Sequence, residues 1–272
     1  MSEPPALRDS RKPTAYFDTF IAEIDDELRD EPNDPVNRLP DDRVRAAWQL
    51  FEGALYVLIA RYSRGDALDS LRPALDEVLR RREQLAEYGD RLPPRQQVMR
   101  RSLERFDNRF KTFDTYLYHL GWWSLAICLG VDDDYRRRML SVTGNAGVDA
   151  LFDRLAIALG DTEREVAPTL AWPKLHAPLL EAMTASPWRQ PALIQACLDR
   201  WYPGCAEAAW HDNHLVEEGD EFELSDCYVG YWCFEAALVV ALHDIGDADF
   251  RDHPFYPADL VRHYRNSRRS LA

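Results

Sequence analysis

The chain has 272 residues, of which 46% are hydrophobic and 29% are charged. This composition excludes a disordered or fibrous protein and indicates a globular one with a buried core. The 33 basic and 47 acidic residues leave a net charge of −14, which argues against a general binder of nucleic acid, because such proteins need a basic face for the phosphate backbone.

The N-terminal stretch carries acidic residues and prolines and lacks an apolar run, so we expect neither a signal peptide nor a transit peptide and a location in the cytoplasm. The most apolar run, residues 228–242, contains Gly230 and Glu235 and is shorter than the roughly 20 residues that a bilayer span needs. It predicts a core helix and no membrane association. The five cysteines are an odd number, three of them in apolar stretches, and we expect no disulfides.

Apolar residues recur at helical spacing through most of the first half. The period predicts helices over residues 15–28, 44–62 and 68–85, the last ending before the Pro93-Pro94 break. It also predicts one long helix over residues 95–129. Five apolar residues spaced by four and three form the stripe of that helix: Phe106, Phe110, Phe113, Leu117 and Leu120. The first half is therefore predicted to be a bundle of about four long helices.

Gly130 followed by the acidic run Asp132-Asp133-Asp134 is typical of one helix ending and another beginning. Beyond it prolines are more frequent, and shorter helices are predicted around residues 146–159, 175–184 and 192–202. We therefore expect an all-α fold, with a helical N-terminal domain over residues 1–130 packed against a second, more irregular helical domain over residues 131–272.

The negative charge is concentrated near the C-terminus. Residues 204–259 contain fourteen acidic residues and one arginine, a net charge of −13. One interpretation is a solvated loop that aids solubility. The other is a surface that steers and holds a basic partner, because a patch of one sign raises the association rate and selects complementary charge. Under that hypothesis the partner-binding residues are Asp212, Glu217, Glu218, Asp220, Glu221, Glu223 and Asp226.

Two sequence elements near the C-terminus resemble a known family. Residues 228–238 read YVGYWCFEAAL, and residues 256–261 read YPADLV. Together they resemble the C-terminal signature of PoNi-type immunity proteins, the bacterial antitoxins that neutralise polymorphic DNase effectors delivered by type VI and related secretion systems. In that family a helical N-terminal domain precedes a helical C-terminal domain that carries a YxGYWxxEAA helix and a YPxDL element. The clear match covers roughly the last 75 residues, and the upstream Trp201-Tyr202 and Trp210 agree with it.

The residue types of the signature indicate a structural role more than a catalytic one. Gly230 would permit close helix approach, and the large aromatic side chains would pack a core. Glu235 lies in an apolar helix and needs a partner, such as an arginine or a tyrosine hydroxyl. Pro257 would start the last helix, and Asp259 would cap its first turn. We predict a structural role for Tyr228, Gly230, Tyr231, Trp232, Glu235, Tyr256, Pro257 and Asp259.

An enzyme of another class is the alternative. His211, His214 and Glu218 have the spacing of one helical face, and His243-Asp244 looks superficially like the metal-binding pair of HD-type phosphohydrolases. These residues leave open a helical metal-dependent hydrolase. The chain has no phosphate-binding loop, GxSxG elbow, CxxC pair or HExxH helix, so we expect no catalytic residues, no metal and no cofactor.

The family resemblance implies an immunity protein that binds and neutralises a cognate nuclease toxin encoded by an adjacent gene. It does not name the toxin, and it leaves open whether inhibition is direct or allosteric. The oligomeric state also stays open, a homodimer included.

Overall fold

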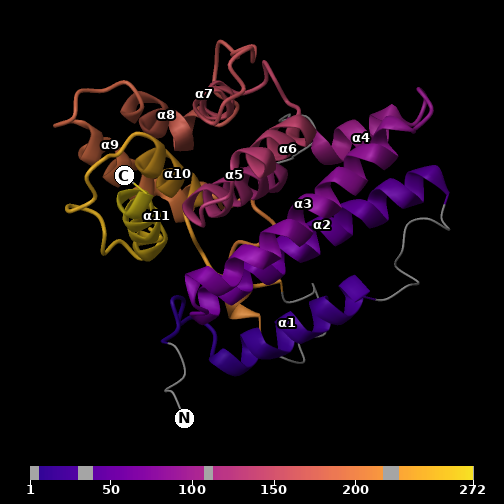
Figure 1. The fold of residues 1–272 in the computed structure, drawn as a ribbon, viewed down its shortest axis with the longest axis horizontal. Coiled ribbons are helices and arrows are strands. Elements are labelled where there is room, and N and C mark those ends of the chain that lie inside the picture. The colour runs from indigo at the N-terminus through magenta and orange to yellow at the C-terminus, as the bar shows by residue number, and fades with distance from the viewer. Residues whose placement is uncertain (1–5, 30–38, 107–112, 217–226, 272) are drawn as a thin grey trace. The chain divides into compact units, whose positions relative to one another are not determined.

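The computed structural model describes residues 6–29, 39–106, 113–216 and 227–271 (Figure 1). Every regular element in these ranges is a helix, which confirms the predicted all-α class. The fold divides into two compact units. Unit 1 comprises Met1–Pro94 and Glu207–Tyr231, and unit 2 comprises Arg95–Ala206 and Trp232–Ala272.

Unit 1 is built on three long helices, α1 (Thr14–Arg29), α2 (Pro40–Arg64) and α3 (Leu68–Asp90), with a short 3-10 turn, η4 (Asn213–Leu215). The predicted helices over residues 15–28, 44–62 and 68–85 are confirmed. Helix α2 packs against both α1 and α3, as Figure 1 shows. Gly53 allows α1 to approach α2 closely, because a Cβ atom there would lie 3.3 Å from Cγ2 of Ile24.

Unit 2 contains the remaining helices. They are α4 (Gln97–Glu104), α5 (Phe113–Cys128), α6 (Asp133–Thr143), α7 (Ala150–Ala158), α8 (Pro173–Ala182), α9 (Gln190–Gly204), α10 (Phe234–Leu242) and α11 (Ala258–Leu271). Every residue of α5 except Asp114 is buried, because α10 and α11 pack against it. A helix that is apolar all round must lie in the core, and α5 is the central helix of this unit.

The single long helix predicted over residues 95–129 is wrong. Helix α4 ends at Glu104, Arg105 has an extended backbone, and α5 begins only at Phe113. The break is stabilised by Asn145, whose side chain accepts a hydrogen bond from the Phe106 amide at 3.0 Å and donates one to the Glu104 carbonyl at 2.8 Å. The predicted bundle of four long helices therefore has three members, and α5 belongs to unit 2.

The helix boundary predicted at Gly130 is confirmed. Gly130 has a φ of +74°, and the Asp132 side chain accepts a hydrogen bond from the Tyr135 amide at 2.8 Å, so Asp132 caps α6. The next helix begins later than the predicted residue 146. Asp149 accepts a hydrogen bond from the Phe152 amide at 2.8 Å and fixes the start of α7 at Ala150.

The signature residues 228–233 are not helical, and α10 begins only at Phe234. Gly230 lies in this non-helical segment and has a φ of +106°, a left-handed conformation that glycine adopts without steric cost. The units also differ from the predicted division into residues 1–130 and 131–272, because the chain passes from one unit to the other more than once.

A search of the described helices for a stretch both long and apolar enough to cross a bilayer found none.

Candidate functional site

The chain before α1 is fixed to residues 228–231 by a buried carboxylate, that of Asp9. This carboxylate accepts hydrogen bonds from the amide of Arg11 at 3.0 Å and from the amide of Tyr231 at 3.1 Å. The Arg11 guanidinium lies 2.8 Å from its second oxygen. These donors compensate the loss of solvation that burial of a charge entails. Sequence reasoning missed Asp9, because its partner Tyr231 is far along the chain.

The backbone of residues 228–231 is held by further side chains of unit 1. The Tyr16 hydroxyl donates to the Tyr228 carbonyl at 3.0 Å, and the Ser63 hydroxyl donates to the Val229 carbonyl at 2.5 Å. A buried non-helical segment needs such partners, because its backbone carbonyls cannot accept hydrogen bonds from the amides of a helix. Residues 228–231 are therefore a fixed part of unit 1.

Tyr231 is the aromatic centre of this region. Its ring lies 4.8 Å from the Tyr228 ring and 5.5 Å from the Trp210 ring, and the Arg11 guanidinium lies 5.2 Å from its centroid. Tyr228 and Tyr231 are both buried. Burial is the main cause that raises the pKa of Tyr228, and the Asp9 carboxylate adds to it.

The histidines of the hydrolase alternative have local structural contacts. His214 Nδ1 lies 3.0 Å from the Tyr231 hydroxyl, and burial, followed by the charge of Arg11, lowers the pKa of His214. His211 Nδ1 lies 3.3 Å from an oxygen of Asp212, whose φ of +64° interrupts any helix between the two histidines. The predicted common helical face is therefore wrong.

The other residues of that alternative are Glu218, His243 and Asp244. Glu218 lies outside the described residues. His243 caps α10, and the following Asp244 has a φ of +48° and an oxygen 3.8 Å from Arg265. Among the residues that the structure describes, no three histidine, cysteine or acidic side chains gather as metal ligands would.

The acidic segment, residues 217–226, is flanked by two described residues of unit 1. At its start, the Val216 carbonyl accepts a hydrogen bond from Lys12 Nζ at 2.7 Å. At its end, Cys227 leads directly into the fixed residues 228–231. Of the seven predicted partner-binding residues, Asp212 is described, with a side chain that is 56% exposed. The others lie outside the described residues: Glu217, Glu218, Asp220, Glu221, Glu223 and Asp226.

Helix α1 adds exposed negative charge to the same unit. It contains five acidic residues and one base, Arg29. Four of the acids are exposed: Asp18, Glu23, Asp26 and Glu27. Arg29 pairs with Asp26 at 2.9 Å, and both side chains are exposed, so this ion pair contributes little to stability. The charge count along the sequence missed α1, because this helix lies far along the chain from residues 204–259, where most of the net negative charge is found.

Glu235, the acid of the signature, is buried in unit 2. Its Oε1 atom accepts a hydrogen bond from the indole nitrogen of Trp201 at 2.5 Å and lies 3.5 Å from Nε2 of His176. The predicted structural partner therefore exists, but it is an indole and not an arginine or a tyrosine hydroxyl. Glu235 joins α10 to α9 and α8.

The remaining signature residues also lie in unit 2. Tyr256 is buried with its ring 5.0 Å from that of Phe250. Pro257 directly precedes α11, and the Asp259 side chain accepts a hydrogen bond from the Leu260 amide at 2.9 Å, in the first turn as predicted. Trp232 differs from the prediction, because it is only partly buried and is not a core residue.

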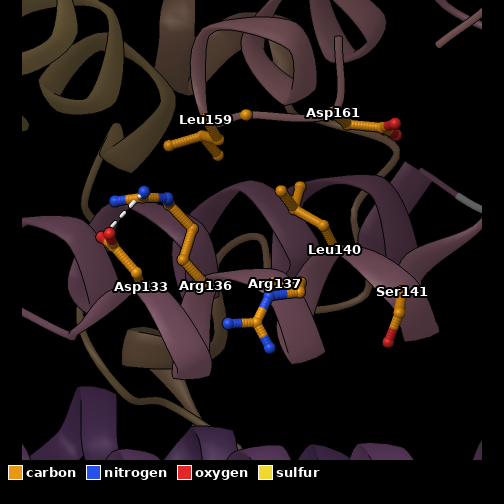
Figure 2. A pocket seen from close by; sticks show the side chains of 8 residues that line it. Asp133, Arg136, Arg137, Leu140, Ser141, Leu159 and Asp161 are labelled. Atoms are coloured by element: carbon orange, nitrogen blue, oxygen red, sulfur yellow. Dashed lines mark ion pairs between the residues drawn. The ribbon is translucent and has the colours of Figure 1, made fainter. Parts of the chain in front are cut away.

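A hollow of 520 Å³ lies in unit 2 between α6 and the end of α7 (Figure 2). Figure 2 shows Arg136 paired with Asp133, at 2.9 Å, on one side and Leu159 and Asp161 on the other. Basic and acidic side chains both line this hollow, so it has no strong preference for ligand charge. No nucleophile with an adjacent general base lies among its described lining residues.

The structure is similar to the crystal structure of protein PA2201 from Pseudomonas aeruginosa. The TM-score is 0.70 at 17% sequence identity, and the match covers 97% of this chain and 92% of the other. At this identity the likeness shows a shared fold. A search of curated proteins found no match.

Two family profiles match the sequence in chain order. Residues 9–141 match the N-terminal part of the PoNe immunity protein (PoNi) family, and residues 147–260 match its C-terminal part. These ranges include Asp9, the α1 acids, Glu235, the first signature element and residues 256–260 of the second. The chain therefore belongs to the PoNe immunity protein family and is an immunity protein against a nuclease effector.

Proposed function

We propose that this immunity protein neutralises its cognate nuclease by covering the DNA-binding groove of that nuclease with the acidic surface around residues 212–226. The effector is encoded by an adjacent gene, and inhibition requires no chemistry by the immunity protein. The observation that carries this proposal is the net charge of −13 over residues 204–259. Residues 216 and 227, which flank the acidic segment, are both part of unit 1.

Electrostatics supports occlusion of the groove. A DNase binds its substrate chiefly through basic side chains that contact phosphates. An acidic protein surface uses the same attraction and thereby competes with DNA for the same groove. Complementary charge of this kind raises the association rate and discriminates against partners that lack a basic groove.

The polar clusters of the described residues support an inhibitor without catalysis. The Asp9 carboxylate is occupied by Arg11 and Tyr231, and the Glu235 carboxylate by Trp201. Each of these acids therefore has a structural contact that accounts for its burial.

The first experiment is protection of growth. Co-expression with the effector from the adjacent gene is expected to restore growth, and the purified chain alone is expected to cleave neither DNA nor phosphate esters. Failure to protect would contradict the proposed function. A purified chain with hydrolase activity that depends on His211 would favour the metal-dependent hydrolase.

The second experiment tests the acidic surface. One variant converts all seven predicted partner-binding acids to their amides. A matched control converts seven exposed acids of unit 2: Asp133, Asp134, Glu163, Glu165, Glu181, Asp249 and Asp252. Both variants change the net charge from −14 to −7.

The variant of the seven acids is expected to associate with the effector on the order of tenfold more slowly at low salt, with a flatter salt dependence, because steering by those carboxylates is lost. The control should stay close to the wild-type rate. Stopped-flow association across salt measures both effects. Equal rates and equal salt slopes for the two variants would remove residues 212–226 from the mechanism.

A further inference from the structure

A groove runs between α1 and α2 on unit 1, with a volume of 450 Å³. Its apolar lining includes Phe20, Ile24 and Leu28 of α1 and Leu50 of α2. Ile24 and Leu28 are partly exposed, and they face Gly53 of α2. The groove is far larger than the roughly 30 Å³ of a single water and has room for side chains of a partner.

The charged residues that line this groove are all acidic. They are Glu27 of α1 and Glu52 of α2, and no basic residue is among the described lining residues. The Tyr56 hydroxyl lies 3.4 Å from an oxygen of Glu52. An apolar floor with acidic edges is complementary to a segment in which apolar side chains alternate with lysine or arginine.

The groove is linked to the acidic segment by the chain itself. Cys227, which directly follows the acidic segment, is one of its lining residues. A partner that lies on residues 212–226 is therefore adjacent to the groove. This continuity favours the nuclease effector over an unrelated protein as the occupant.

We infer that the groove between α1 and α2 binds a segment of the effector that carries apolar side chains flanked by lysine or arginine. This inference rests on the proposed function and adds a second, apolar contact to the acidic one. The apolar contact supplies burial that resists dissociation, whereas the acidic segment mainly raises the association rate.

The first test uses Cys227 as a reporter in the unaltered chain. Cys227 is partly exposed, whereas the other four cysteines are buried. Burial also raises the pKa of Cys128 to about 12, and it raises the pKa of Cys205 and Cys233. Because the thiolate is the reactive form, a small alkylating reagent such as iodoacetamide should modify Cys227 first, and C227S should lack this rapid reaction.

In the complex with the effector, alkylation of Cys227 is expected to slow by about tenfold or more, because the groove is covered. An unchanged rate in a complex whose nuclease activity is still inhibited would overturn the groove inference and leave the proposed function intact. The inference would also be overturned if, without the effector, alkylation of Cys227 slowed as the concentration of the immunity protein rose. The occupant of the groove would then be a second copy of the chain.

The second test compares two charge reversals on α1. Glu27→Arg places a cation at the groove, and Asp26→Arg is the matched control on the neighbouring residue, whose side chain points about 100° away around the helix. Both residues are exposed, so both variants should fold. Thermal unfolding of each variant verifies this before binding is measured.

At physiological salt, where exposed charges are screened beyond about 8 Å, Glu27→Arg is expected to raise the dissociation constant of the complex by about tenfold. Asp26→Arg should change it by less than about threefold. Equal effects of the two variants would contradict a role for the groove. If the wild-type chain itself did not inhibit the nuclease, the proposed function would be contradicted instead.

Discussion

At the scale of single residues, the acids of this chain fall into two classes that differ in burial. Asp9 and Glu235 are buried and bonded to specific donors, whereas Asp212 and four of the five acids of α1 are exposed. The first class stabilises the fold through hydrogen bonds that replace water. The second class is exposed, so its ion pairs contribute little to stability.

The contact between Glu235 and Trp201 gives a prediction for stability. Trp201→Phe removes the indole donor and leaves the buried carboxylate without this hydrogen bond, which should lower the free energy of unfolding by about 3–5 kcal/mol. The double variant Trp201→Phe/Glu235→Leu should lose less than the single variant, because it leaves no uncompensated charge. Urea unfolding measures both, and strictly additive losses would contradict this account.

His243 gives a prediction for pH. Burial lowers the pKa of His243, so the folded state binds a proton less readily than the unfolded state. The contribution of His243 to stability is therefore present above the unfolded pKa of about 6.5 and is lost as the pH falls through the lower folded value. Urea unfolding between pH 7.5 and 5 should show a shallower loss of stability for His243→Gln than for the wild type, and an unchanged slope would refute the assignment.

The sequence predicts that Glu235 needs a partner but not which one. Its position in an apolar run shows the burial, and burial requires a donor. The donor, Trp201, comes from another helix, and only tertiary packing brings it to 2.5 Å. The role of Asp9 could not be predicted at all, because nothing near it in the sequence marks it as buried.

At the scale of elements, the presence of a helix could be predicted where apolar residues recur strongly at helical spacing. The end of a helix could be predicted where the capping residue lies next to it in the sequence. Asp132 and Gly130 mark their boundary with neighbouring residues. The break after Glu104 was missed, because its stabilising side chain, Asn145, lies far away in sequence. The non-helical residues 228–233 were likewise missed, because their apolar content is typical of a core helix.

The cap of α6 gives a prediction for this scale. Asp132→Ala should lower the free energy of unfolding by about 0.5–2 kcal/mol, because the Tyr135 amide loses its acceptor. Asp133→Ala, one residue along, is the control. The side chain of Asp133 is 84% exposed, so Asp133→Ala should lower the free energy of unfolding by less, within about 0.5 kcal/mol. Similar losses for the two variants in urea unfolding would show that Asp132 does not act as a cap.

At the scale of the whole molecule, the acidic charge and the family assignment lead to the same account. The chain has a net charge of −14, most of it within residues 204–259, and it belongs to a family of immunity proteins. The fold class and the family signature were readable from the sequence. The division into units was not, because contacts between segments far apart in sequence define each unit.

The central claim is that the immunity protein occupies the groove in which the nuclease binds DNA. The most direct measurement follows the fluorescence anisotropy of a labelled DNA duplex bound to a catalytically inactive effector while the immunity protein is added. The account predicts that the duplex is released as one equivalent of immunity protein binds, because both ligands need the same basic side chains. A stable ternary complex that keeps the duplex bound while nuclease activity is inhibited would contradict it.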